Sequence, residues 1–126
     1  MKVHRVLVVF ITAFLMFPFE TLAEDCAPEG GSACAGLNSH DSFLTADKAL
    51  NDTYRKLLSA MNKPEWQDAK RALIASQRAW VTLRDKDCEF DQILSGGFNK
   101  APGLDCKTGM TNERTSYLER VLEGIK

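Results

Sequence analysis

Residues 75–88 read ASQRAWVTLRDKDC and are the most informative part of the chain. Four side chains recur there at intervals of three, four and four residues: Gln77, Trp80, Arg84 and Cys88. Residues at these intervals lie along one stripe of an α-helix. Because the stripe combines an aromatic ring, a cysteine and two hydrogen-bonding groups, we predict a small disulfide-stapled helical domain with a polar network in its core.

The N-terminus has the pattern of a secretory signal peptide. Basic residues precede an apolar run at 6–17, and small residues follow at 21–23. The run is shorter than the roughly 20 residues that cross a bilayer. We therefore predict a signal peptide at 1–23 and a mature domain at 24–126, with no membrane span after cleavage.

All four cysteines follow the predicted cleavage site: Cys26, Cys34, Cys88 and Cys106. An even number in a short exported chain favours two disulfides over a metal site, and the spacing contains no CxxC pair. Asp25 precedes Cys26, where attachment of a lipid would require a small residue. We expect a periplasmic or secreted protein without a lipid anchor.

The charge of the mature chain argues against a nucleic-acid partner. The whole chain has 16 basic and 17 acidic side chains, and removal of Lys2, Arg5 and Glu20 leaves 14 and 16. Nucleic-acid binding proteins favour a strongly basic surface. Nucleic acid is therefore excluded as the expected partner.

Apolar spacing predicts three helices. The first runs from about His40 to Met61, and the second starts at Pro64 and ends at or before Ser95. Glycines and a proline predict an irregular loop over 96–109, and Thr111 or Asn112 can cap the last helix. The expected fold is all-α, with a long antiparallel helix hairpin plus a shorter C-terminal helix.

A tight turn at 62–63 makes the first two helices antiparallel, so residues whose numbers sum to about 128 should face each other. This register places Asp47 close to Arg84 and Asn51 opposite Gln77. A buried carboxylate is costly unless it is paired, so we interpret these four residues as a structural polar network. No nucleophile or second carboxylate lies beside Asp47 in this register, and we expect no catalytic residue, metal site or cofactor.

The same register bears on the disulfides. It places Cys88 near residue 40, within one or two turns of Cys34. We favour Cys34–Cys88 together with Cys26–Cys106. The competing pattern, Cys26–Cys34 with Cys88–Cys106, stays open.

Two segments resemble motifs of the LprI-type lysozyme inhibitor family. Residues 46–54 resemble its AD-x-x-LN-x-x-Y segment, and residues 77–88 resemble its QRAW-x-x-x-RD-x-x-C segment. The resemblance implies an exported helical domain, and the named member of the family inhibits lysozyme. That namesake is a lipoprotein, whereas this chain lacks the lipid-attachment signal.

Inhibition of a lysozyme or another peptidoglycan hydrolase calls for an acidic surface, because lysozymes are usually basic. Four acids cluster at the end of the second helix: Asp85, Asp87, Glu89 and Asp91. The loop at 95–109 adds Phe98 and Asn99, and Phe98 either anchors a partner or, as we slightly favour, folds back over the core. These six residues are the candidates for binding the partner.

A second class of function stays open. The domain could be an envelope interaction domain, an adaptor or the immunity partner of a toxin. In both hypotheses the protein is not an enzyme, since the register assembles no catalytic set.

Overall fold

The computed structural model describes residues 32–126, with side chains from residue 35 onward. Three long helices lie side by side within this part: α1 (Ser32–Ala60), α2 (Gln67–Leu94) and α3 (Ala101–Gly124). A short 3-10 helix, η1 (Pro64–Trp66), leads into α2. The predicted all-α fold, with an antiparallel hairpin followed by a shorter helix, is confirmed. The predicted signal peptide and Cys26 lie outside the described residues.

The turn between α1 and α2 forms where the sequence predicts it. Pro64 occupies the first position of η1, where the missing N–H of proline leaves no hydrogen bond unmade. The Gln67 side-chain amide donates to the carbonyls of Met61 and Lys63, at 3.2 and 3.0 Å. These bonds satisfy carbonyl groups of the turn that follows α1 and help to hold η1 against it.

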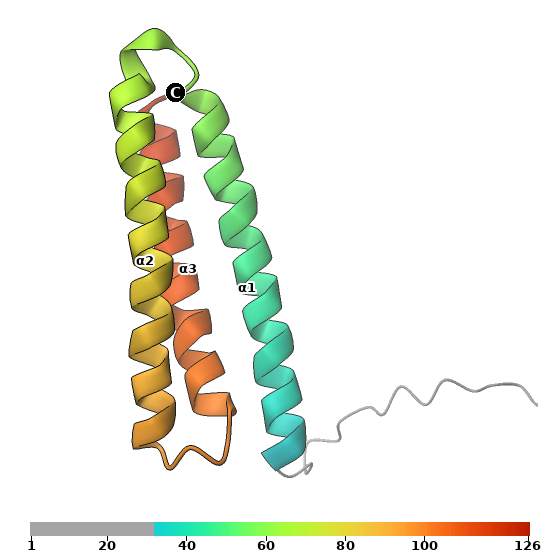
Figure 1. Cartoon of the computed structure of the whole chain (residues 1–126). Helices are drawn as coiled ribbons and strands as arrows, with labels where there is room; N and C mark the ends of the chain where they lie inside the picture. The colour runs from blue at the N-terminus through green and yellow to red at the C-terminus, as the bar shows by residue number, and fades with distance from the viewer. Residues whose placement is uncertain (1–31) are drawn as a thin grey trace, which may run out of the picture.

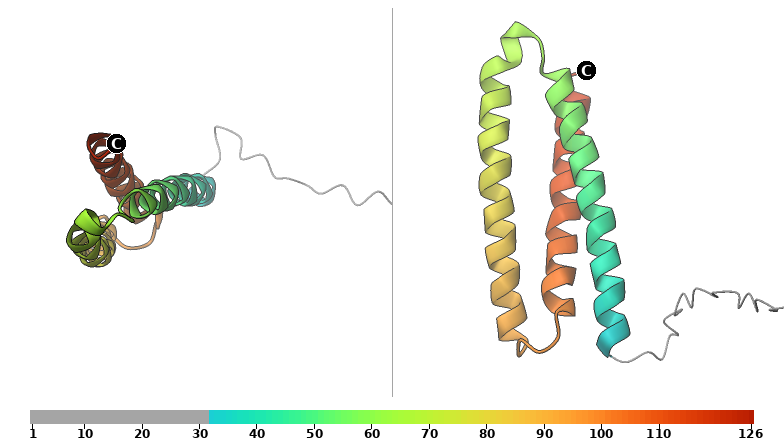
Figure 2. Two further views of the ribbon diagram at one scale, coloured as in Figure 1. Left: turned by 90° about the horizontal axis from the view of Figure 1, so that it is seen from above. Right: turned by 45° about the vertical axis from the view of Figure 1, so that its right-hand side comes forward.

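Helix α3 lies between the two arms of the hairpin and packs most extensively along α1 (Figure 1). Helices α1 and α2 meet at the turn and diverge toward the other end, and Figure 2 shows the same arrangement from a second side. The direct seam between α1 and α2 that the register predicted is therefore largely replaced by contacts of each helix with α3.

Helix α3 begins about ten residues earlier than predicted. Pro102 lies in its first turn, where helices tolerate proline, and the Asn99 side-chain oxygen accepts a 2.9 Å hydrogen bond from the Ala101 N–H. The predicted irregular loop at 96–109 is thus wrong, and the true connection is the short turn 95–100. The glycines that suggested a loop, Gly103 and Gly109, are helical.

Gly103 is required by the close approach of α3 to α2. A Cβ atom at this position would lie 3.1 Å from the carbonyl oxygen of Cys88 and 2.9 Å from the side-chain oxygen of Gln92. Such distances crowd the α2 backbone, which cannot move without disturbing its own hydrogen bonds. Gly103 therefore sets how closely the two helices pack.

Replacing Gly103 with alanine is expected to lower the free energy of unfolding by about 1–2 kcal/mol through overpacking. Gly109→Ala is the matched control, because a Cβ there meets open space. It should raise stability by about 0.5–1 kcal/mol through helix propensity. Urea unfolding measures both, and equal effects of the two substitutions would show that the close approach is not limiting.

The apolar core lies in the half of the molecule near the hairpin turn. Its fully buried members are Leu50, Leu57, Met61 and Leu118. Trp66 of η1 and Leu73 and Trp80 of α2 pack against them. Toward the other end the helices are joined by polar contacts and a disulfide instead.

Candidate functional site

Arg84 is the centre of a buried polar network. Its side chain is only 6% exposed, and its Nη1 donates to Asp47 Oδ1 at 3.1 Å and to Thr111 Oγ1 at 3.2 Å. Its guanidinium also lies 5.1 Å from the centroid of the Phe43 ring. A long arginine side chain can thus connect α2 to both α1 and α3 where the hairpin arms diverge. The predicted proximity of Asp47 and Arg84 is found.

The other half of the predicted network is arranged differently. Asn51 donates to Asp47, at 3.0 Å to the carboxylate and 2.9 Å to the backbone carbonyl, and does not meet Gln77. Gln77 instead accepts a 2.9 Å hydrogen bond from Arg114 Nε of α3. The expected Asn51–Gln77 contact is wrong because α3, rather than α1, lies against this part of α2.

A disulfide joins Cys88 to Cys106, with the two Cα atoms 5.5 Å apart. The favoured pairs Cys34–Cys88 and Cys26–Cys106 are therefore wrong. The observed bond is one of the two in the competing pattern. The early start of α3 explains the error, since it brings Cys106 onto a helix directly beside Cys88. Cys26 and the side chain of Cys34 lie outside the described part of the chain, so their predicted pairing stays a prediction.

The described charges divide between the two ends of the molecule. We call residues 35–47 and 84–112 the acidic pole. It has seven carboxylates and four lysine or arginine side chains, whereas the remaining described residues have six and ten. The excess acids therefore gather at the end that holds the turn 95–100. The acidic residues of this pole are Asp41, Asp47, Asp85, Asp87, Glu89, Asp91 and Asp105.

Two of the four predicted partner-binding acids are already paired within the chain. Asp85 Oδ1 lies 3.1 Å from Arg84 Nη2 and 3.3 Å from Lys107 Nζ. Glu89 accepts a 2.7 Å hydrogen bond from Lys86, which lowers the pKa of Glu89 and raises the pKa of Lys86. Asp87 and Asp91 are exposed and have no ion-pair partner among residues 35–126.

The turn 95–100 holds Phe98 out in solvent. Gly96 and Gly97 have φ values of 98° and 74°, which favour glycine, and their N–H groups donate to carbonyls of Ile93 and Gln92. The Phe98 side chain is fully exposed. The favoured expectation that it folds back over the core is wrong. Asn99, by contrast, uses its side-chain oxygen within the turn, at the start of α3.

Phe98 is one of several exposed apolar side chains at this end. Phe90, Ile93 and Leu94 in the last turns of α2 are each more than 60% exposed. These three residues are three and four positions apart and share one face of α2, beside Asp87 and Asp91, and we call them, together with Phe98 on the following turn, the apolar cluster. Contiguous exposed apolar surface on a soluble protein often marks a binding site.

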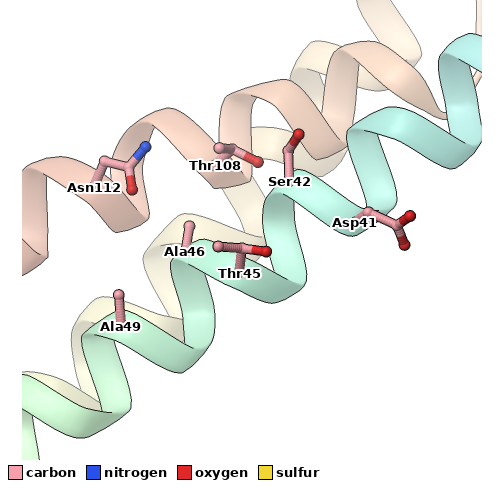
Figure 3. Close-up of a pocket in the computed structure, with 7 residues that line it drawn as sticks. All are labelled: Asp41, Ser42, Thr45, Ala46, Ala49, Thr108 and Asn112. Carbon is pink, nitrogen blue, oxygen red and sulfur yellow. The ribbon is translucent and has the colours of Figure 1, made fainter.

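A groove of about 570 Å³ lies between α1 and α3 (Figure 3). Small and polar side chains line it, and Ser42 of α1 lies across from Thr108 of α3. The one carboxylate in the lining, Asp41, extends away from Thr108 and Asn112 (Figure 3). With this single carboxylate, the lining of the groove does not offer the paired carboxylates that glycoside hydrolysis uses.

The sequence model of the lysozyme inhibitor LprI family matches residues 26–118. The chain belongs to the lysozyme inhibitor LprI family. The LprI match contains both hairpin motifs, the disulfide Cys88–Cys106 and most of α3, so the resemblance seen in the sequence is confirmed.

Two curated proteins are similar to this LprI family member. The uncharacterized protein R02472 of Rhizobium meliloti (strain 1021) is 28% identical over 113 residues, which cover 81% of each chain. The uncharacterized protein YecT of Escherichia coli (strain K12) is 32% identical over 83 residues. That match covers 58% of this chain and 51% of YecT. No solved structure matches significantly.

Some residues of the polar network were not predicted from the sequence, chiefly those that α3 supplies. Thr111 is fully buried and contacts Arg84, and Arg114 contacts Gln77. The spacing of Thr111, Arg114, Thr115 and Leu118 could have marked a face with polar groups, had α3 been extended back to Ala101. The ring of Phe43 in α1 also lies beside the Arg84 guanidinium. None of the described helices is both long and apolar enough to cross a membrane.

Proposed function

We propose that this chain is an exported, non-enzymatic inhibitor of a lysozyme-type peptidoglycan hydrolase, which it binds with Asp87, Asp91 and Phe98. The membership of the LprI family is the observation that carries this proposal. The geometry of the acidic pole supports the choice of surface, because that end combines excess negative charge with exposed apolar side chains.

The unpaired acids favour a role outside the fold itself. Asp87 and Asp91 lie in the last turns of α2, near the negative end of the helix dipole, where carboxylates are slightly destabilising. Neither compensates for this with an ion pair in the described part of the chain. An acidic surface attracts a basic enzyme and accelerates its association.

The apolar cluster supplies what charge alone does not. Aromatic side chains at the centre of an interface account for much of the affinity when they enter a pocket. Phe98 is fully exposed and stands on a turn whose backbone is already hydrogen-bonded. A pre-formed turn loses little conformational entropy when it binds, which favours affinity.

A location outside the cytoplasm fits this target. The disulfide Cys88–Cys106 favours an oxidising environment. We propose that residues 1–23 act as a signal peptide and that residues 24–126 function in the periplasm or outside the cell.

Titration of a basic lysozyme with the oxidised chain 24–126 in a cell-wall lysis assay tests the function. We expect saturable inhibition close to one inhibitor per enzyme. Raising the ionic strength from about 0.01 to 0.15 M shortens the Debye length from about 30 to 8 Å, so the inhibition should weaken severalfold. The rate of turbidity loss measures both effects.

The reduced and unfolded chain serves as the control for nonspecific effects on the cell walls. Full lysozyme activity at a large molar excess of the folded, oxidised chain would refute the proposal for that enzyme. Inhibition that is independent of salt would retain the function but remove the charge argument for the acidic pole.

A further inference from the structure

Arg114 of α3 is held rigidly at the edge of a second groove. Its Nε donates to Gln77 Oε1 at 2.9 Å, and its Nη2 donates to Ser76 Oγ at 3.0 Å. The guanidinium lies 5.7 Å from the centroid of the Trp80 ring and 5.2 Å from that of Tyr117. Hydrogen bonds and ring contacts together fix its orientation before any ligand is present.

The positive charge of Arg114 is not matched by a carboxylate. Among residues 35–126, no Asp or Glu lies within ion-pair distance of it, whereas Arg84 contacts both Asp47 and Asp85. The partners of Arg114 are a neutral amide and a neutral hydroxyl. These bonds use only some of the five N–H donors of the guanidinium group. The planar arrangement of the donors matches the two oxygens of a carboxylate.

The groove beside Arg114 is apolar. It runs between α2 and α3 near the hairpin turn and has a volume of about 290 Å³. Its floor consists of Met61, Leu73, Leu118 and Val121. Ala69 and Ala72 on the α2 side are small, so their side chains leave the groove open.

We propose that this groove binds an aliphatic carboxylate, with the carboxylate on Arg114 and the hydrocarbon chain along the apolar floor. The unpaired cation selects a negative head group, and the floor selects an apolar body. A water molecule occupies roughly 30 Å³ in the liquid. Taking the same volume for each non-hydrogen group of a ligand, the groove holds about ten such groups. A straight-chain acid of about eight carbons has this size.

The groove is independent of the surface proposed to bind the hydrolase. Its residues lie near the hairpin turn, whereas Phe98 and Asp91 lie at the opposite end of α2. Failure of lysozyme inhibition would leave this inference intact, and failure of this inference would leave the inhibition intact. The ligand site also gives a role to Gln77, which orients Arg114.

Nuclear magnetic resonance titration of the ¹⁵N-labelled oxidised chain with octanoate tests the site. We expect saturable shifts at Ala69, Ala72 and Tyr117, with a dissociation constant on the order of a millimolar. Octan-1-ol and octylamine have the same chain length without the negative charge, and they should bind at least about tenfold more weakly. Shifts at the turn 95–100 instead would place the ligand elsewhere and overturn the proposal.

Arg114→Gln should weaken octanoate binding at least about tenfold, because the charge-assisted hydrogen bonds are lost. Arg78→Gln removes the same charge from an exposed position of α2 and should leave the binding unchanged. Ala72→Phe fills the groove and keeps the Arg114 side chain, so it should abolish binding, and it provides a second test if Arg114→Gln fails to fold. Equal affinity for octanoate and octan-1-ol, or no saturable shift for octanoate, would overturn the proposal.

Discussion

Replacing Arg84 with alanine is expected to lower the free energy of unfolding by about 3 kcal/mol. The substitution removes a nearly buried side chain that joins Asp47 of α1, Thr111 of α3 and the ring of Phe43. It also leaves a void beside Trp80 and an unsatisfied hydroxyl at the fully buried Thr111. Urea denaturation followed by circular dichroism measures the loss.

Arg84→Met separates packing from charge. Methionine fills most of the space without a positive charge, and replacement of buried ion pairs by apolar groups is often nearly neutral, so we expect a loss of about 1 kcal/mol. Asp47 is 37% exposed and can be hydrated when Arg84 is absent, which limits the cost of the unpaired carboxylate. An Arg84→Ala variant as stable as the native chain would contradict the central place of this network.

Removal of the Cys88–Cys106 disulfide in the double variant Cys88→Ala/Cys106→Ala is expected to cost about 3 kcal/mol. The bond closes a segment with a sequence separation of 18 residues, and a loop of about 15 residues gives this magnitude in the chain-entropy account. At this end of the molecule, α2 and α3 are otherwise joined mainly by the Arg84–Thr111 hydrogen bond, the Asp85–Lys107 ion pair and the close approach at Gly103, with few large apolar contacts. Chemical unfolding of the oxidised double variant against the native chain measures the difference.

The pairing itself is tested by proteolysis of the oxidised chain and mass spectrometry. A linked peptide pair that contains Cys88 and Cys106 is expected, and it should disappear on reduction. A Cys34–Cys88 link would exclude the Cys88–Cys106 bond. That result would contradict the disulfide that joins α2 to α3 beside the turn 95–100.

The hairpin could be predicted from the sequence because its signals are local. Pro64 marks the turn, because the residue before a proline avoids the helical conformation, and the apolar residues between 43 and 61 follow a regular helical spacing. The start of α3 could not be predicted in the same way. Gly103 and Gly109 read as loop residues, but Gly103 is needed by a close approach of two helices that appears only in the folded chain.

The polar network shows the same limit. The hairpin register placed Asp47 near Arg84 correctly, because arginine is long enough to cross the space between diverging helices. The same register failed for Asn51 and Gln77, whose shorter side chains contact whatever lies beside them. For Gln77 that neighbour is Arg114 of α3, and no spacing within the hairpin could show that α3 would lie between its arms.

The central claim is that Asp87 and Asp91 lie in the surface that binds the hydrolase. The most direct test compares Asp87→Lys/Asp91→Lys with Glu119→Lys/Glu123→Lys, which makes the same change in net charge near the other end of the molecule. Calorimetric titration against a basic lysozyme should show at least about a tenfold loss of affinity for the first variant and little change for the second. Equal losses for both variants, or none for the first, would contradict the claim.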